Sequence, residues 1–189
     1  MMKKLNKIKW LIKHPLWVGL VVFGVLSLLI KVTGSAEADR VAWMLQSNDF
    51  NLVGPERRAF ANFLVDTAKD NDFDPLLIMA IMKVESEFRT DAVSHRGAMG
   101  LLQLKPVAAR EVADQINFKI KSKHELLDPF KNLAIGVQYL VHLRELFGYD
   151  LHKILTAYNM GPTLAKQLHT LPQGYVRKVL RAYQDLNDS

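Results

Sequence analysis

From Pro55 onward, apolar residues recur at every third or fourth position, the spacing that places them on one face of an α-helix. The clearest stripes are Phe60, Phe63, Leu64 and Ala68, and then Leu133, Val137, Leu140 and Val141. We find no segment in which polar and apolar residues alternate over a length that would indicate a sizeable sheet. The pattern therefore predicts an all-α fold class, with a compact helical domain over residues 55–189.

Capping signals show where these helices are expected to begin and end. Asp74-Pro75 and Asp128-Pro129 each combine an N-cap carboxylate with a proline suited to the first helical turn, and Phe147-Gly148 indicates a helix end. The helices expected on this basis run over residues 55–70, 75–88, 107–113, 129–147, 151–158, 163–169 and 175–185.

The first 36 residues have a different pattern. Lysines at positions 3, 4, 7, 9 and 13 precede the 15 uncharged and mostly apolar residues from Leu16 to Ile30. A basic segment followed by an apolar one is typical of an export signal whose lysines stay in the cytoplasm. A helix of this length rises about 23 Å at ~1.5 Å per residue, which is short of a hydrocarbon core of ~30 Å.

Two interpretations of this segment stay open. A retained signal-anchor would make a single-pass protein of the bacterial inner membrane, with the domain in the periplasm. A signal peptide cleaved near Ala36 would release the domain into the periplasm. Residues 37–54 begin with small and polar residues and end at the helix-breaking pair Gly54-Pro55, so we expect them to form a tether.

Charge and cysteine content exclude several classes of function. The formal net charge is +6, but residues 1–40 carry +5 of it and the remaining chain only +1, so the domain has no basic surface that would indicate nucleic-acid binding. The chain contains no cysteine, and therefore neither disulfides nor a lipid-modified cysteine. No pair of its six histidines has the spacing of a metal site such as H-E-x-x-H, so we expect no metal and no cofactor.

Glu85 is the strongest candidate for chemistry. It lies near the end of an almost entirely apolar helix and shares a face with Ile78, Ile81 and Met82. A carboxyl group beside hydrocarbon is harder to ionise, which raises its pKa toward the range of a general acid. Asp91 is the only other acid near the following glycine-rich loop, and we expect it to form part of the turn. A purely structural role for Glu85 in a cap or salt bridge is the alternative.

Four segments, in order along the chain, resemble motifs of one enzyme family. They are Glu85-Ser86-Glu87-Phe88 with the loop Ser94-His95-Arg96-Gly97-Ala98-Met99-Gly100-Leu101-Leu102-Gln103, Asp128-Pro129 with Asn132, Gly136 and Tyr139-Leu140, Ala157-Tyr158-Asn159-Met160-Gly161-Pro162, and Gly174-Tyr175-Val176-Arg177. Over residues 58–183 the chain is similar to the soluble-type (SLT) lytic transglycosylases of the lysozyme-like superfamily. The resemblance implies a lysozyme-like helical fold and cleavage of peptidoglycan between N-acetylmuramic acid and N-acetylglucosamine.

The resemblance also implies a mechanism and a set of site residues. Glu85 would act first as acid and then as base, and the product would be a 1,6-anhydromuramic end. Ser94 would hydrogen-bond the sugar near its N-acetyl group, and Gln103 would contact the substrate or orient Glu85. Tyr158 would place its hydroxyl near Glu85 or the N-acetyl group, and Asn159 would brace the site.

The glycines and the last motif have smaller implied roles. Gly97 and Gly100 would let the loop backbone approach the glycan, and we expect Tyr175 to be structural. Two departures from the family pattern concern substrate placement. Lys105 stands where methionine is common, which would put a cation at the edge of the groove, either solvated or in reach of stem-peptide carboxylates. Leu171-Pro172-Gln173 stands where many members have an acidic residue.

Two rival functions remain. A goose-type muramidase would hydrolyse the same bond with water, and a non-catalytic, membrane-tethered module would only bind peptidoglycan. In each case the expected partners are peptidoglycan glycan strands and, through the N-terminal helix, the membrane. A cell-envelope complex is a further candidate partner, and nucleic acid is not.

Overall fold

A computed structural model describes residues 36–115, 118–168 and 170–189, and these residues are helical throughout their regular structure. The expected all-α class is confirmed for them, since their only β-type pairings are the isolated bridges Val93–Met99 and Met99–Leu104. In chain order the elements are α3 (Ala36–Ser47), α4 (Gly54–Asp70), α5 (Pro75–Ser86), α6 (Pro106–Gln115), the short 3-10 helix η1 (Lys123–Leu127), α7 (Pro129–Phe147), α8 (Leu151–Met160), α9 (Pro162–Gln167) and α10 (Gln173–Asn187).

Helix α5 lies in the middle of the core. Its residues from Leu77 to Met82 are all buried, as expected for a helix that is apolar on almost every side. The Asp74 carboxylate accepts a hydrogen bond from the backbone of Leu76, and Pro75 occupies the first turn, so the helix begins where the sequence predicts. It ends at Ser86, two residues earlier than expected, because Glu87 and Phe88 turn into the left-handed region.

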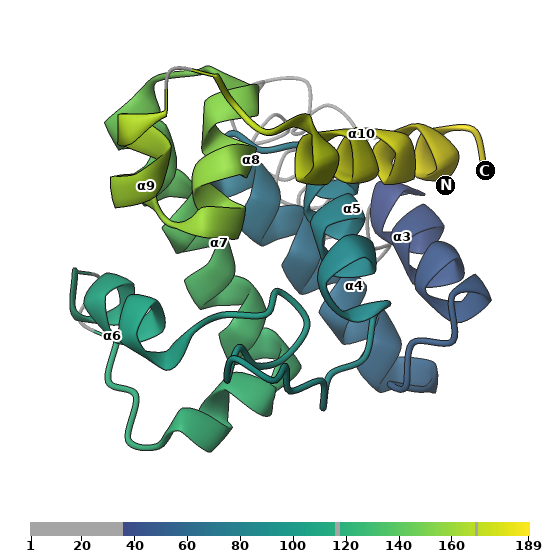
Figure 1. The fold of residues 1–189 in the computed structure, drawn as a ribbon. Coiled ribbons are helices and arrows are strands. Elements are labelled where there is room, and N and C mark those ends of the chain that lie inside the picture. The colour runs from purple at the N-terminus through teal and green to yellow at the C-terminus, as the bar shows by residue number, and fades with distance from the viewer. Residues whose placement is uncertain (1–35, 116–117, 169) are drawn as a thin grey trace, which may run out of the picture. The chain divides into compact units, whose positions relative to one another are not determined.

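Helix α10 packs along α5 more extensively than any other pair of described helices, and Figure 1 shows the two side by side. Helix α10 also contacts α8, while α4 and α7 pack against each other. Two tyrosines of α10 bond to carboxylates at the two ends of α5. The Tyr183 hydroxyl donates to Asp74 at 2.5 Å, and the Tyr175 hydroxyl donates to Glu85 at 2.6 Å.

Residues 37–54 differ from the expected tether. Helix α3 occupies most of this segment and buries Ala38, Val41, Met44 and Leu45 in the same hydrophobic core as α5 and α10. The Arg40 guanidinium donates to the carbonyls of Leu186 and Asn187 near the end of α10. The small and polar residues around position 36 concealed this stripe in the sequence, although its spacing is helical.

The N-terminal membrane or signal helix predicted within residues 1–36 lies almost entirely outside the described residues. Within the described part of the chain, none of the helices has both the length and the apolar character that crossing a bilayer requires.

The burial of α3 predicts a stability effect. Met44 is 1% exposed, so Met44→Ala should lower the free energy of unfolding by about 2–5 kcal/mol by leaving a cavity in the core. Its neighbour Trp43 is 55% exposed, and Trp43→Ala should cost less than about 1 kcal/mol. Urea denaturation of both variants checks this. Equal and small effects would show that α3 is the tether the sequence suggested.

Candidate active site

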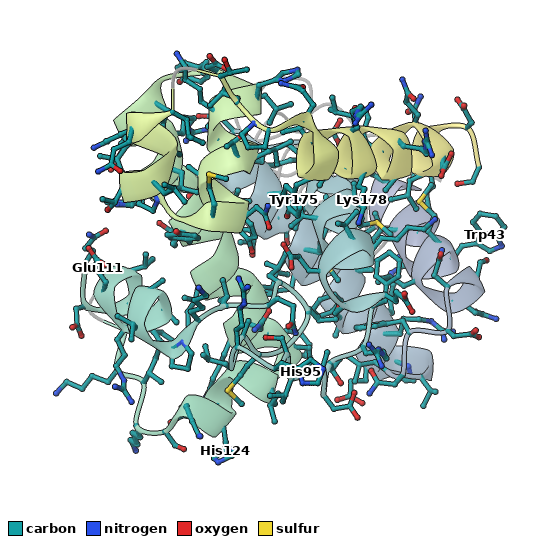
Figure 2. The ribbon with its side chains drawn as sticks, in the orientation of Figure 1. Trp43, His95, Glu111, His124, Tyr175 and Lys178 are labelled. Carbon is teal, nitrogen blue, oxygen red and sulfur yellow. The ribbon has the colours of Figure 1, made fainter. Side chains whose placement is uncertain are left out.

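The Glu85 side chain lies in the last turn of α5, where it is half-buried and faces the N-terminal end of α10. The Tyr175 hydroxyl lies 2.6 Å from Glu85 Oε1 and donates to it. Figure 2 shows Tyr175 where α10 passes α5. The expectation that Tyr175 is only structural thus missed a direct contact with the candidate acid. Ninety residues separate the pair in sequence, so no local pattern could have revealed it.

Burial raises the pKa of Glu85 above its ordinary value, and the hydrogen bond from Tyr175 partly offsets that rise. The two tyrosines of the site keep their protons over a wide pH range. Burial, followed by the nearby charge of Glu85, raises the pKa of both Tyr158 and Tyr175 well above 10. A carboxyl group that retains a proton at higher pH than usual, beside neutral hydroxyl donors, can serve as a general acid.

Glu85 opens into a cleft of about 530 Å³. The glycine-rich loop after α5 and one face of α6 form part of its wall, and α7, α8 and the start of α9 complete it. In Figure 1, α6 lies on one side of this region and α8 and α9 lie on the other. The lining residues used below are Glu85, Ser94, Arg96, Gln103, Lys105, Glu111, Tyr139, His142, Tyr158 and Asn159.

All four residues predicted to bind substrate therefore line one cleft with Glu85. Two of them also hold the loop in place. Ser94 Oγ accepts a hydrogen bond from the backbone of Ala98 at 3.0 Å, and the Gln103 amide donates to the carbonyls of Ala92 and Gly100. The Gln103 amide nitrogen is thus used within the loop, which favours a role in shaping the cleft.

Tyr158 and Asn159 occupy the last turns of α8. The Tyr158 hydroxyl donates to the Leu102 carbonyl at 2.7 Å, so it ties α8 to the loop, while its ring lies 5.5 Å from the ring of Tyr139. Asn159 is exposed at the cleft. The Tyr158 hydroxyl bonds a backbone carbonyl here, rather than Glu85.

The two loop glycines do not line the cleft. Both have positive φ, 72° for Gly97 and 74° for Gly100, which explains the residue type. At Gly100 a side chain would collide with the Leu126 carbonyl and with the amide of Asn132. Close packing of the loop on the domain, rather than approach to a ligand, requires glycine at position 100.

Asn132 is the buried support of this loop. Its side chain is 0% exposed and makes three hydrogen bonds: it accepts from Leu102 N–H and donates to the carbonyls of Met99 and Leu126, all at 2.8–2.9 Å. The motif that contains Asn132 does not by itself predict this role. A polar residue on the apolar face of a predicted helix was the available signal, because buried amides are almost always fully bonded.

The cleft also contains charges that the sequence did not bring together. Glu111 on α6 is a second carboxylate of the cleft, whereas Asp91, expected to be the only acid near the loop, is not among the lining residues. Arg96, Lys105 and His142 line the cleft as well. For Glu111 on α6 and His142 on α7, only the tertiary placement of these helices shows that the side chains share a site with Glu85.

Comparison with protein families gives a match to the Transglycosylase SLT domain over residues 64–174, which is more than half of the chain. The chain belongs to the SLT transglycosylase family. Two curated relatives are both called membrane-bound lytic murein transglycosylase C. The protein from Klebsiella pneumoniae is 39% identical over 141 residues, and the one from Mannheimia succiniciproducens is 28% identical over 148 residues.

Solved structures share the fold of this SLT domain. The chain superposes on the lytic transglycosylase Slt from Pseudomonas aeruginosa with a TM-score of 0.62 and 26% identity, and the match covers 81% of this chain. That structure is of an inactive Glu-to-Gln mutant. The 70 kDa soluble lytic transglycosylase from Escherichia coli gives a TM-score of 0.62 at 22% identity, with 84% of this chain covered.

Both curated relatives and both solved structures are longer proteins. The matches cover 70–71% of this SLT chain but only 37% of the Klebsiella protein and 40% of the Mannheimia protein. They cover 30% and 31% of the two crystallised chains.

The Tyr175 contact predicts a change in the titration of Glu85. Tyr175→Phe removes the hydrogen bond that lowers the pKa of Glu85 and leaves the burial that raises it, so the pKa should rise further. Carbon-13 NMR titration of the glutamate carboxyls measures this directly. Tyr183→Phe, which removes a hydroxyl bonded to Asp74 at the other end of α5, should leave Glu85 unchanged. Identical Glu85 titrations in both variants would contradict the contact.

The three bonds of Asn132 predict a large stability effect. Asn132→Ala leaves buried groups of the loop without partners and should lower the free energy of unfolding by about 2–4 kcal/mol. Asn48→Ala is a matched control, because the Asn48 amide bonds a carbonyl four residues away within α3 and should cost about 1 kcal/mol or less. Denaturant unfolding compares them, and similar losses would argue against Asn132 as the loop's support.

Proposed function

We propose that this chain is a peptidoglycan lytic transglycosylase that cleaves the β-1,4 bond between N-acetylmuramic acid and N-acetylglucosamine. The observation that carries the proposal is the half-buried Glu85, with its raised pKa, facing a cleft of about 530 Å³. Membership of the SLT family and the names of its longer relatives support the same activity. In the Pseudomonas protein, replacing one glutamate with glutamine gives an inactive mutant, which is consistent with an essential glutamate in such enzymes.

In the proposed reaction Glu85 first acts as an acid. Its carboxyl proton passes to the glycosidic oxygen, the bond from that oxygen to C1 of the muramic acid breaks, and the N-acetyl group of the same sugar stabilises the positive charge that develops at C1. Substrate assistance of this kind removes the need for a second carboxylate acting as nucleophile. Burial of Glu85 supports this step, since it favours the protonated form.

Glu85 then acts as a base. Its carboxylate takes the proton from the C6 hydroxyl of the muramic acid, and the oxygen of that hydroxyl bonds to C1. The product carries a 1,6-anhydro ring, Glu85 is protonated again and no water is consumed. Tyr175 would assist both steps as a positioning residue, because its hydroxyl holds Oε1 from the side of α10.

Hydrolysis by a muramidase-type mechanism is the second candidate, and Glu111 is the observation that favours it. Glu111 is an exposed carboxylate lining the same cleft, which is the type of group that can activate a water molecule. A purely binding module is less well supported, because burying an acid at a cleft costs free energy that binding alone does not require.

We also propose that the domain works outside the cytoplasmic membrane. The basic and apolar pattern of residues 1–30 and the membrane-bound names of the curated relatives support this location. Peptidoglycan strands would be the substrate there, and the membrane would be contacted through the N-terminal segment.

Product analysis of purified sacculi tests the reaction. The wild-type chain should release muropeptides that mass spectrometry finds lighter by one water than hydrolytic products. Glu85→Gln should reduce the rate by about 10²–10⁴-fold, the usual contribution of a general acid. It should keep its fold, because a neutral amide replaces a group whose charged form is already disfavoured. Glu87→Gln is the matched control, since Glu87 is exposed and is not a lining residue.

The outcomes separate the candidates. Products with only reducing ends would favour the muramidase. Cleavage by Glu85→Gln at the wild-type rate would show that another group, or no group of this cleft, provides the acid.

A further inference from the structure

Two basic side chains line the cleft without a protein partner. Arg96 and Lys105 are both exposed, and neither makes an ion pair or side-chain hydrogen bond with the described residues. Some other cations of the described residues are engaged, such as Arg58 with Asp39 and Lys131 with Glu125, while Arg110 is also unpaired but lies outside the cleft. Cations that line a cleft and lack internal partners are available to a negatively charged ligand.

The backbone holds both cations in fixed places. Arg96 lies in a closed turn in which Ser94 N–H donates to the Ala98 carbonyl at 2.9 Å and Ala98 N–H donates to Ser94 Oγ at 3.0 Å. Lys105 directly precedes α6, and its carbonyl accepts from Ala109 N–H at 2.9 Å. The side chains can move, but each starts from an ordered position at the wall of the cleft.

The cations have a role separate from that of the acid. The raised pKa of Glu85 results from burial, which the hydrogen bond from Tyr175 partly offsets, and neither Arg96 nor Lys105 is among the causes of the shift. A cation placed to stabilise the ionised acid would instead lower that pKa. The glycan backbone itself is uncharged, so these cations do not match the sugars that Glu85 would act on. The negative charges of peptidoglycan are the free carboxylates of the stem peptides attached to its muramic acids.

We propose that Arg96 and Lys105 bind the carboxylates of a stem peptide, so that the cleft prefers peptide-bearing glycan over bare glycan. The proposal rests on peptidoglycan as the substrate and adds a specificity determinant to it. Each exposed charged contact contributes a factor of about 1.5 to 5 in affinity. Two contacts should therefore give a preference of about 2- to 25-fold, and added salt should weaken it.

The experiment compares two substrates, which are glycan strands with intact stem peptides and the same strands after an amidase has removed the peptides. The measured quantity is the ratio of kcat/KM values for the two substrates, with the full chain in detergent. The Arg96→Gln/Lys105→Gln double variant should lower this ratio by about 2- to 25-fold. Arg110→Gln, a cation on α6 outside the cleft, should leave it unchanged. An unchanged ratio in the double variant, or an equal fall in Arg110→Gln, overturns the proposal.

A binding measurement keeps this test separate from the proposed reaction. Calorimetry with a soluble muramyl peptide should give a dissociation constant that rises about 2- to 25-fold in the double variant, and also when the peptide carboxylates are amidated. If wild type cleaves neither substrate but binds in this way, the lytic activity is refuted and the carboxylate site stands. If neither the double variant nor amidation changes the dissociation constant, the carboxylate site is refuted, whatever the enzyme cleaves.

Discussion

The packing of α10 along α5 is the constraint on which the other features of the domain depend. Helix α5 is buried on almost every side, yet it carries a carboxylate at each end, and α10 supplies a tyrosine hydroxyl to each of them. Burial raises the pKa of Glu85, while the hydroxyl of Tyr175 on α10 holds the carboxyl group and limits the rise. The contact that stabilises the fold is thus also the one that determines the protonation of the candidate acid.

A second set of hydrogen bonds holds the glycine-rich loop that forms one wall of the cleft. Asn132 on α7 bonds the loop at Met99 and Leu102, and the Leu102 carbonyl accepts from Tyr158 on α8. The buried Ser86 hydroxyl at the end of α5 donates to Leu101 in the same loop. Because its buried polar groups are satisfied, this loop can stay in one conformation although it contains little regular structure.

The two proposals give the cleft two separate tasks. In the proposed function, proton transfer belongs to Glu85, which is half-buried and accepts a hydrogen bond from the Tyr175 hydroxyl. Charge recognition is assigned to Arg96 and Lys105, which are exposed and make no contact that would tie them to the acid. This separation lets substrate preference change through surface residues without altering the protonation of Glu85.

The helical class, most helix boundaries to within two residues and Glu85 as the candidate acid could be predicted from the sequence, because apolar periodicity and capping are local signals. The prediction from sequence was wrong for residues 37–54, whose buried stripe has meaning only against α5 and α10. Three contacts became visible only in the folded chain. They are the hydrogen bond from Tyr175 to Glu85, the bonds of Asn132 to the loop, and the position of Glu111 in the same cleft as Glu85. Each depends on which helix faces which, and the spacing of residues along one chain carries no information about a partner many residues away.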